Sequence, residues 1–312
     1  MRNITLLLFF VWIFAAGEVL AQGNISNPSA ARDYYRRGGQ REHAKQLAEA
    51  LADYAKAGEL DPMMSEAHFA RSAICAEMKD YRGAISALTA CLKARPNGYS
   101  ALFNRGLYHE YLKEYDDAIA DYSLALAEDA DFSNQVDTSQ QCRAHAHHYR
   151  GRVYQWYKND SKKAIIDYSD ALRLYPAIEM VLYRRGQAHH TVKEYAKAHS
   201  DFERAVEQDP EYPNLLNSWA WQLATCPDAE FRDGKLAIEF AKKTKQLETL
   251  AAGYAETGNF VDAIAAQVRA IEQLEQVKDK TNAKAVEHRV KVQAEMEVRL
   301  ETYRAKQPFR EE

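Results

Sequence analysis

Apolar and small residues recur along the chain with a period of about 34 residues, and residues 179–210 show the pattern most fully. In that stretch the key positions, at offsets 8, 20, 24, 27 and 32, are Gly186, Ala198, Phe202, Ala205 and Pro210. The same offsets hold similar residues in the stretches that begin at residues 31, 65, 99 and 144. Repetition at this period predicts pairs of helices, each pair too small to bury its own apolar face and therefore stacked on its neighbours.

The residue types at these offsets indicate how one helical pair is built. Small residues at offsets 8, 20 and 27 let neighbouring helices approach closely, while larger residues at offsets 4 and 24 fill the remaining space. The proline at offset 32 ends the second helix because it cannot donate a backbone hydrogen bond. In the repeat that begins at residue 144 the spacing is one residue longer, which predicts an insertion in the turn at residues 158–160.

Two segments interrupt the grid. Residues 131–143 are largely polar and predict a loop, within which Asp137 or Thr138 caps the helix that follows. The linker between the sixth and seventh repeats is almost absent. Either residues 234–257 form one nearly continuous helix, or a tight bend falls near residues 243–246.

The composition favours an all-α chain, because glycine and proline are scarce, at 13 and 8 residues, and good helix formers dominate. The pattern and its interruptions together predict the organisation of the whole chain. We expect a signal peptide at 1–21, regular repeats at 31–130, a loop at 131–143, regular repeats at 144–212, divergent repeats at 213–276 and a charged helical cap at 277–312.

The 34-residue grid resembles the tetratricopeptide repeat. This resemblance implies a right-handed α-solenoid of helix–turn–helix repeats, acting as a non-catalytic scaffold that binds a peptide or helix of another protein in its concave groove. The segments AWQLATCPDAEFRDGKLAIEFA and RLETYRAKQPFREE resemble the C-terminal part of exported bacterial members. The lysines and asparagines with which some members clamp a C-terminal carboxylate are not reproduced. The alternative is a structural, self-associating component of an envelope complex.

The net charge and the lack of known catalytic motifs limit the functions that we expect. The formal net charge is −4, so no whole-chain field recruits nucleic acid or an acidic membrane. The sequence has no glycine-rich phosphate loop, no nucleophile elbow and no CxxC, so we expect no catalytic residue and no cofactor. His145 and His148 could share a metal, but no third ligand is evident, and no metal site is expected.

Residues 1–21 differ from the rest of the chain. Arg2 precedes an apolar run at residues 4–16, and Val19 and Ala21 are small residues at the −3 and −1 sites, which predicts cleavage before Gln22. The alternative, an uncleaved anchor, would need about 20 apolar residues to span a bilayer. We therefore expect export to the periplasm or envelope of a Gram-negative-type bacterium, or secretion, with no membrane span after cleavage.

Arginine occupies offset 7 in all five regular repeats, and aspartate accompanies it at the position of offset 23 in four of them. We expect bidentate ion pairs that join the two helices of a repeat at a half-buried seam. The alternative is a positive stripe that binds carboxylates. The expected pairs are Arg37 with Asp53, Arg105 with Asp121, Arg150 with Asp167 and Arg185 with Asp201.

A column of rings occupies offset 5, which lies towards the concave face in tetratricopeptide arrays. Such rings offer stacking surfaces and apolar anchors for a partner peptide. The alternative is that they serve packing alone, and an oligomer remains open. The expected partner-binding residues are Tyr35, Phe69, Phe103, His148, Tyr183, Gln187 and His190.

Two cysteines share the second repeat. Cys75 and Cys91 stand at offsets 11 and 27, both on packing faces, and buried free thiols are the first expectation. Because export would allow oxidation, a disulfide between them is the alternative.

Overall fold

The computed structural model describes residues 27–133, 139–178, 180–276 and 283–311. Within these ranges the chain consists of helices, turns and loops, with one isolated parallel β-bridge between Gly98 and Asp131. The chain divides into two compact units, an N-terminal unit that ends at Lys158 and a C-terminal unit that begins at Asn159. The predicted signal peptide at 1–21 lies outside the described residues, as do Asp137 and Thr138.

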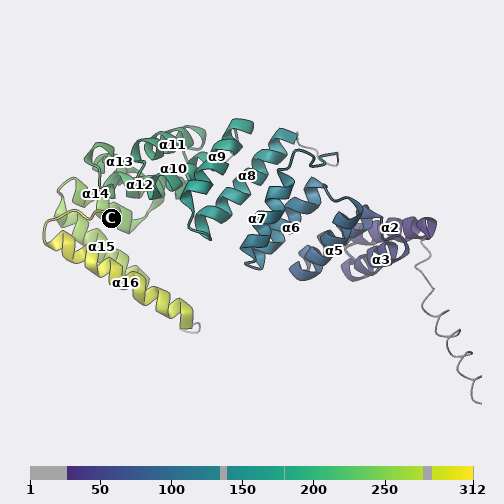
Figure 1. Ribbon diagram of the computed structural model, residues 1–312. Helices are drawn as coiled ribbons and strands as arrows, with labels where there is room; N and C mark the ends of the chain where they lie inside the picture. The colour runs from purple at the N-terminus through teal and green to yellow at the C-terminus, as the bar shows by residue number, and fades with distance from the viewer. Residues whose placement is uncertain (1–26, 134–138, 179, 277–282, 312) are drawn as a thin grey trace, which may run out of the picture. The chain divides into compact units, whose positions relative to one another are not determined.

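The described part of the N-terminal unit consists of three helical pairs and one further helix (Figure 1). The helices of each pair pack against each other, and each second helix of the first two repeats packs on the first helix of the next. The helices are α2 (Pro28–His43), α3 (Leu47–Leu60), α4 (Ser65–Glu77), α5 (Tyr81–Ala94), α6 (Tyr99–Tyr111), α7 (Tyr115–Ala125) and α8 (Ser139–Trp156).

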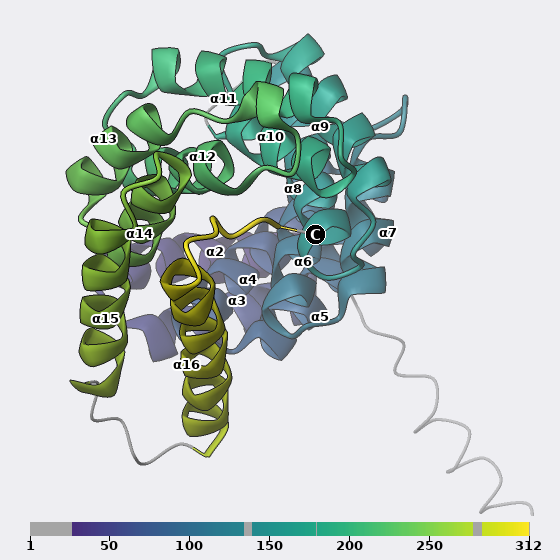
Figure 2. The same ribbon diagram turned by 90° about the vertical axis from the view of Figure 1, so that its left-hand side faces the viewer.

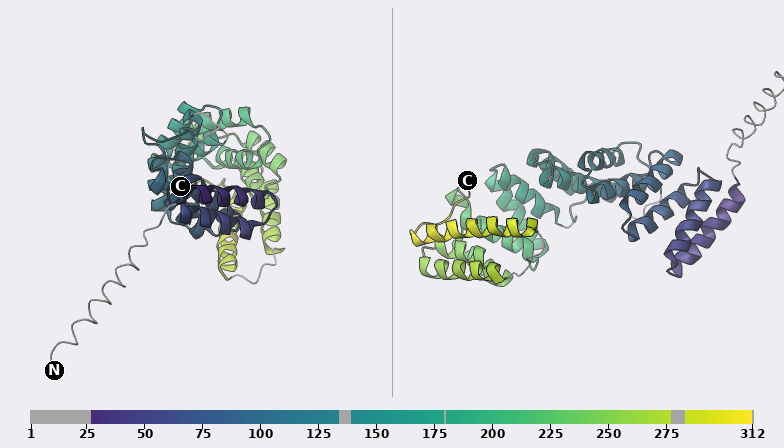
Figure 3. Two further views of the ribbon diagram at one scale, coloured as in Figure 1. Left: turned by 90° about the vertical axis from the view of Figure 1, so that its right-hand side faces the viewer. Right: turned by 90° about the horizontal axis from the view of Figure 1, so that it is seen from below.

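The C-terminal unit continues the same pattern and ends in the charged helix. Helix α16 (Ala283–Arg304) lies beside α15 (Phe260–Gln276) (Figure 2 and Figure 3). The helices before them are α9 (Ser161–Leu174), α10 (Val181–Thr191), α11 (Tyr195–Gln208), α12 (Pro213–Thr225), the 3₁₀-helix η1 (Ala229–Phe231), α13 (Gly234–Thr244) and α14 (Leu247–Glu256). The predicted all-α repeat fold is thus confirmed.

Close packing within a pair depends on a glycine that faces a ring. A Cβ atom added at Gly38 would lie 2.7 Å from Cε1 of Tyr54, and one at Gly106 would lie 2.9 Å from Cε1 of Tyr122. Both tyrosines are buried. The glycine at offset 8 therefore creates the space that the ring at offset 24 fills, as the grid predicts.

Residues in the left-handed conformation close the turns between paired helices. Four of these turns have a lysine with positive φ at the same offset of the repeat: Lys45, Lys79, Lys113 and Lys193. In the fourth repeat Asn159 has this conformation instead, one offset later, where the spacing predicts an inserted residue.

The junction between the sixth and seventh repeats is a tight bend. Helix α13 ends at Thr244, Lys245 has φ 57°, and α14 begins at Leu247. The alternative of one nearly continuous helix over residues 234–257 is therefore wrong. The left-handed residue reverses the chain without the linker that the regular repeats use.

Helix α16 covers the last repeat with its C-terminal half. Met296, Leu300 and Tyr303 are buried, whereas Val290 is exposed. The side-chain amide of Gln267, on α15, donates a hydrogen bond of 3.0 Å to the carbonyl oxygen of Met296. The helix therefore caps the array with one apolar stripe and leaves its charged face in solvent.

Candidate functional site

A cavity of about 600 Å³ lies on the first helices of the N-terminal unit, and we call it the N-terminal groove. It is lined from α2, α4, α6 and α8. Its rings are Tyr35, Phe69, Phe103, Tyr149 and Tyr99, and its charged or polar side chains are Ser65, Glu66, Arg95, Ser100, Asn104, Asp131 and His145. Three of the predicted ring positions thus share one surface.

The rings of the groove are anchored by the rings of the helical pairs beneath them. The centroids of Tyr35 and Tyr54 are 5.6 Å apart, and Phe103 lies 5.6 Å from Tyr122. Phe103 also meets the edge of Tyr149 at 5.1 Å. Tyr35 and Phe103 therefore each pack on a buried ring of the core and also line the groove, so the same side chains could serve packing and recognition.

A short segment after the third repeat forms one rim of the groove. The backbone N–H of Asp131 donates to the carbonyl oxygen of Asn97 at 2.6 Å, and the N–H of Tyr99 donates to the carbonyl oxygen of Asp131 at 3.0 Å. The ring of Phe132 lies 5.0 Å from that of Tyr99. This part of the predicted loop is attached to the linker between the second and third repeats.

The rim neutralises Arg95, the one arginine in the described lining of the groove. Arg95 forms an ion pair with Asp131 and donates to the hydroxyl of Ser133 at 2.7 Å. Hydrogen bonds from the backbone and hydroxyl of Ser133, followed by that from Arg95, lower the pKa of Asp131 to about 2. Asp131 is therefore ionised at neutral pH and balances the charge of Arg95.

Glu66 is the remaining charged side chain of the groove. It is exposed, and its carboxylate accepts a hydrogen bond from the hydroxyl of the neighbouring Ser65 at 3.3 Å. Because Arg95 and Asp131 compensate each other, the groove carries one net negative charge, at Glu66, when His145 is neutral.

The arginine–aspartate pairs lie inside the repeats and are not part of the groove lining. The guanidinium group binds both carboxylate oxygens at 2.6–2.8 Å in three repeats, joining Arg37 to Asp53, Arg105 to Asp121 and Arg185 to Asp201. These aspartates are each 3 % exposed. Arg150 and Asp167 fall in different units, and their pair stays a prediction.

These arginines make a further contact that the sequence analysis missed. Arg105 donates to Thr89 at 3.2 Å, and Arg185 donates to Ser169 at 3.1 Å. In both cases the hydroxyl belongs to the second helix of the preceding repeat. The guanidinium group therefore joins neighbouring repeats as well as the two helices of its own repeat.

A histidine–glutamate pair accompanies the aspartate in two repeats. The Nδ1 atoms of His109 and His189 lie 2.8 and 2.6 Å from carboxylate oxygens of Glu114 and Glu194. The shared spacing, a histidine five residues before a glutamate, is visible in the sequence, but it spans a turn and has no helical period. These pairs fix the turn of each repeat.

His109 and Glu114, with Asp117, also place three ligand atoms within 4.8 Å of one another, a spacing that a metal ion could use. The fifth repeat has the same histidine–glutamate pair with Lys197 at the position of Asp117. A cation at that position would oppose metal binding, so the pair itself is a structural feature of the repeat.

The other predicted partner-binding residues do not join the N-terminal groove. Among the described residues, His148 is not part of its lining, and its ring packs 5.4 Å from Tyr149. Tyr183, Gln187 and His190 belong to α10 in the C-terminal unit. The amide of Gln187 donates to the Tyr183 hydroxyl at 2.8 Å and to Ser218 at 3.0 Å, which ties α10 to α12.

Cys75 and Cys91 are free thiols. Cys75 and Cys91 are both buried, and so are Cys142 and Cys226. The alternative of a disulfide between Cys75 and Cys91 is therefore not realised in this structure. Burial raises the pKa of both Cys75 and Cys91, which keeps them protonated.

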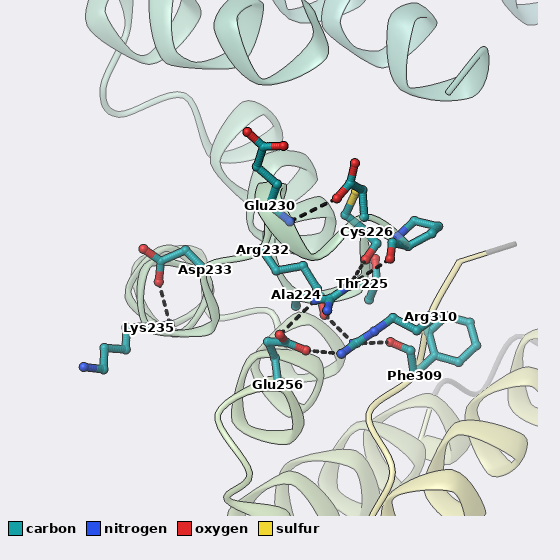
Figure 4. Close-up of polar contacts among 12 residues, drawn as sticks. Ala224, Thr225, Cys226, Glu230, Arg232, Asp233, Lys235, Glu256, Phe309 and Arg310 are labelled. Carbon is teal, nitrogen blue, oxygen red and sulfur yellow. Dashed lines mark hydrogen bonds and ion pairs between the residues drawn. The ribbon is translucent and has the colours of Figure 1, made fainter. Parts of the chain in front are cut away.

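A second cluster of polar contacts lies in the C-terminal unit. Residues 307–311, which we call the C-terminal strap, leave α16 and contact the ends of α12 and α14. In Figure 4, Glu256 lies between Arg232 and Arg310 and forms ion pairs with both. Arg310 also donates to the carbonyl oxygen of Ala224 at 3.2 Å. Sequence periodicity gave no sign of this cluster.

Comparison with known proteins identifies the class. Family models described as tetratricopeptide repeat match residues 76–131 and 180–212. With the helical pairs described above, these matches show that the chain contains tetratricopeptide repeats. Repeats of this class are protein-interaction modules, so the fold supports an interaction scaffold. No curated protein sequence matches the chain significantly.

Solved structures with the same fold are similar at low sequence identity. A tetratricopeptide repeat protein from Parabacteroides merdae has a TM-score of 0.55 at 14% identity, covering 85% of this chain and 99% of that chain. The C-terminal part of a protein from Cytophaga hutchinsonii gives 0.56 at 19%, covering 81% and 98%. YrrB, described as a tetratricopeptide repeat protein with an unusual peptide-binding site, gives 0.50 at 16%, covering 65% and 96%. No described helix is both long and apolar enough to cross a membrane.

Proposed function

We propose that the protein is a non-catalytic adaptor whose N-terminal groove binds an extended peptide segment of another protein. The observation that carries this proposal is a cavity of about 600 Å³ walled by half-buried rings held from the core. Rigid rings with one free side provide apolar anchor sites at low entropic cost. The peptide-binding site named for YrrB is in keeping with such a use of this fold.

The charges in the groove indicate which charged residue the bound peptide would carry. Asp131 already neutralises Arg95, while Glu66 is exposed and keeps its charge available. A peptide that places an aromatic or aliphatic side chain between Phe69 and Phe103 would find Glu66 as the partner for a lysine or arginine. The proposed ligand is therefore an extended segment with an apolar anchor and a nearby basic residue.

Selection from a library of displayed random peptides tests this proposal. The purified chain should enrich peptides that combine an apolar anchor with a basic residue, and Phe69→Ala should reduce their binding at least about tenfold. Leu124→Ala on α7, where the side chain is 53 % exposed and outside the groove lining, is the matched control. Equal loss in both variants, or enrichment without sequence preference, would rule out the groove as the site.

The proposal includes export of the chain. It is supported by the basic residue, the apolar run and the small residues within 1–21, which are typical of a secretory signal. Mass spectrometry of the mature N-terminus after cell fractionation tests it. We expect a chain that starts at Gln22 in the envelope or medium, and an intact Met1 in the cytoplasmic fraction would contradict export.

A further inference from the structure

The C-terminal strap lies on the ends of three first helices, not only on the last repeat. The carboxylate of Glu311 accepts a hydrogen bond of 2.6 Å from Nε1 of Trp221 on α12, and its other oxygen lies 3.7 Å from Nε2 of His190 on α10. Arg310 pairs with Glu256 on α14. First helices form the concave face of a tetratricopeptide array, so the strap covers the face on which recognition is expected.

The strap is held as a bound peptide would be held. It has no helical structure of its own, and the backbone N–H of Glu311 donates to the carbonyl oxygen of Thr225 at 3.1 Å. The ring of Phe309 lies 6.0 Å from that of Trp221 and packs near Arg299. An aromatic anchor, a half-buried arginine and an acid thus occupy successive sites, which is the pattern of extended peptide recognition.

The surface beneath the strap offers a complete set of binding groups. These are one donor at Trp221 Nε1, the end carbonyls of α12 at Ala224 and Thr225, and the carboxylate of Glu256. Carbonyls at the end of a helix need partners from outside the helix, and a cation is favoured there. Arg232 holds Glu256 in place from the other side at 3.0 Å, independently of the strap.

We propose that this surface is a second peptide-binding site, occupied in cis by the chain's own Phe309-Arg310-Glu311 and able to take the same aromatic–arginine–acidic sequence from another chain. This second site is separate from the N-terminal groove, since it belongs to the other unit and uses different residues. The strap then acts as a tethered competitor, present at an effective concentration on the order of millimolar. A partner is accepted when the strap is displaced.

A labelled peptide of residues 305–311, AKQPFRE, tests the proposal on the full chain by fluorescence anisotropy. Arg310→Glu sets two carboxylates against each other at Glu256 and should release the strap, so the peptide should bind this variant at least about tenfold more tightly than the wild type. The control is Arg304→Glu, which changes an exposed arginine of α16 outside the strap. It should behave as the wild type.

A variant that keeps the charge of Arg310 separates recognition from a general loosening of the fold. In Arg310→Lys the strap keeps the positive charge that pairs with Glu256, so reversing that charge in Arg310→Glu should raise binding of AKQPFRE, whereas Arg310→Lys should leave it near the wild-type level. A peptide with alanine for arginine, AKQPFAE, should bind Arg310→Glu at least about tenfold more weakly than AKQPFRE. Equal binding of the two peptides would overturn the proposal.

Phe309→Ala is a second opening variant, because it removes only the ring of the strap. If either opening variant folds by circular dichroism and yet binds the peptide no better than Arg304→Glu, the site is not a peptide site. If neither folds, the strap is an integral part of the core, and the proposal is equally wrong. Neither result would bear on the N-terminal groove, which has its own variants in Phe69 and Glu66.

Discussion

At the scale of single residues, the buried aspartates join the helices of the array through ion pairs with arginines. Asp53 accepts hydrogen bonds from both Arg37 and Arg41, and Arg37 lowers the pKa of Asp53 most strongly. In the third and fifth repeats the arginine that binds the aspartate, Arg105 or Arg185, also donates a hydrogen bond to a hydroxyl of the preceding repeat. A charge that is buried and shared in this way stabilises the stacking only while all partners are present.

Removing one such aspartate should therefore destabilise the N-terminal unit clearly. Asp121→Ala leaves the guanidinium of Arg105, whose side chain is only 19 % exposed, without its carboxylate. We expect a loss of about 3 kcal/mol in the free energy of unfolding, measured by urea denaturation. Asp116→Ala, at a side chain 84 % exposed, should change it by less than about 0.5 kcal/mol. Equal effects would contradict the structural role of the pair.

His68 should make the stability of the first two repeats sensitive to acid. Its Nε2 atom lies 3.1 Å from the carbonyl oxygen of Pro62, while its buried Nδ1 has no hydrogen-bond partner among the described residues. Burial lowers the pKa of His68 below its ordinary value of 6.5. The folded state thus favours the neutral ring, and this contribution is complete above pH 6.5 and is lost as the pH falls from 6.5 through the lowered pKa.

Thermal unfolding between pH 7.5 and 5.5 checks this expectation. The melting temperature of the wild type should fall more over this range than that of His68→Gln, which cannot take up the proton. The other histidines contribute equally to both proteins, so the difference isolates His68. Parallel curves for the two proteins would show that burial of this ring does not couple to protonation.

At the scale of the helical pair, two adjacent glycines of α2 provide a matched test of the packing rule. A Cβ at Gly38 would lie 2.7 Å from the Tyr54 ring, whereas the nearest atom to a Cβ at Gly39 is the Tyr54 hydroxyl oxygen at 3.7 Å. Gly38→Ala should therefore cost about 1–3 kcal/mol of unfolding free energy through overpacking. Gly39→Ala should add about 0.5–1 kcal/mol, because alanine favours the helix. A stabilising Gly38→Ala would refute the role given to offset 8.

Contacts that recur along the chain could be predicted from the sequence, whereas contacts that occur once could not. The glycine–ring contacts and the arginine–aspartate pairs recur at one offset in several repeats, so one alignment of the chain with itself predicts them. The rim joins Arg95 to Asp131, 36 positions apart, and the strap joins Trp221 to Glu311, 90 positions apart. Neither contact recurs at a fixed offset in the described repeats. Such contacts depend on where irregular segments return in space, which residue spacing does not encode.

At the scale of the whole molecule, each compact unit carries one of the two proposed recognition surfaces. In the N-terminal unit the groove is lined by rings and has Glu66 as its available charge. In the C-terminal unit the first helices carry the strap. The ring column predicted across five repeats therefore divides: Tyr35, Phe69 and Phe103 line the groove, whereas Tyr183 packs against Phe202 of α11 and against Tyr212, the residue before α12.

The central claim is that the N-terminal groove reads a basic residue through Glu66, and a charge exchange measured by calorimetric titration tests it most directly. A peptide selected on the wild type should bind Glu66→Lys at least about tenfold more weakly, and the same peptide with glutamate in place of its basic residue should recover most of that loss. If both peptides bind both proteins with unchanged affinity, the groove does not bind peptides in the way proposed here.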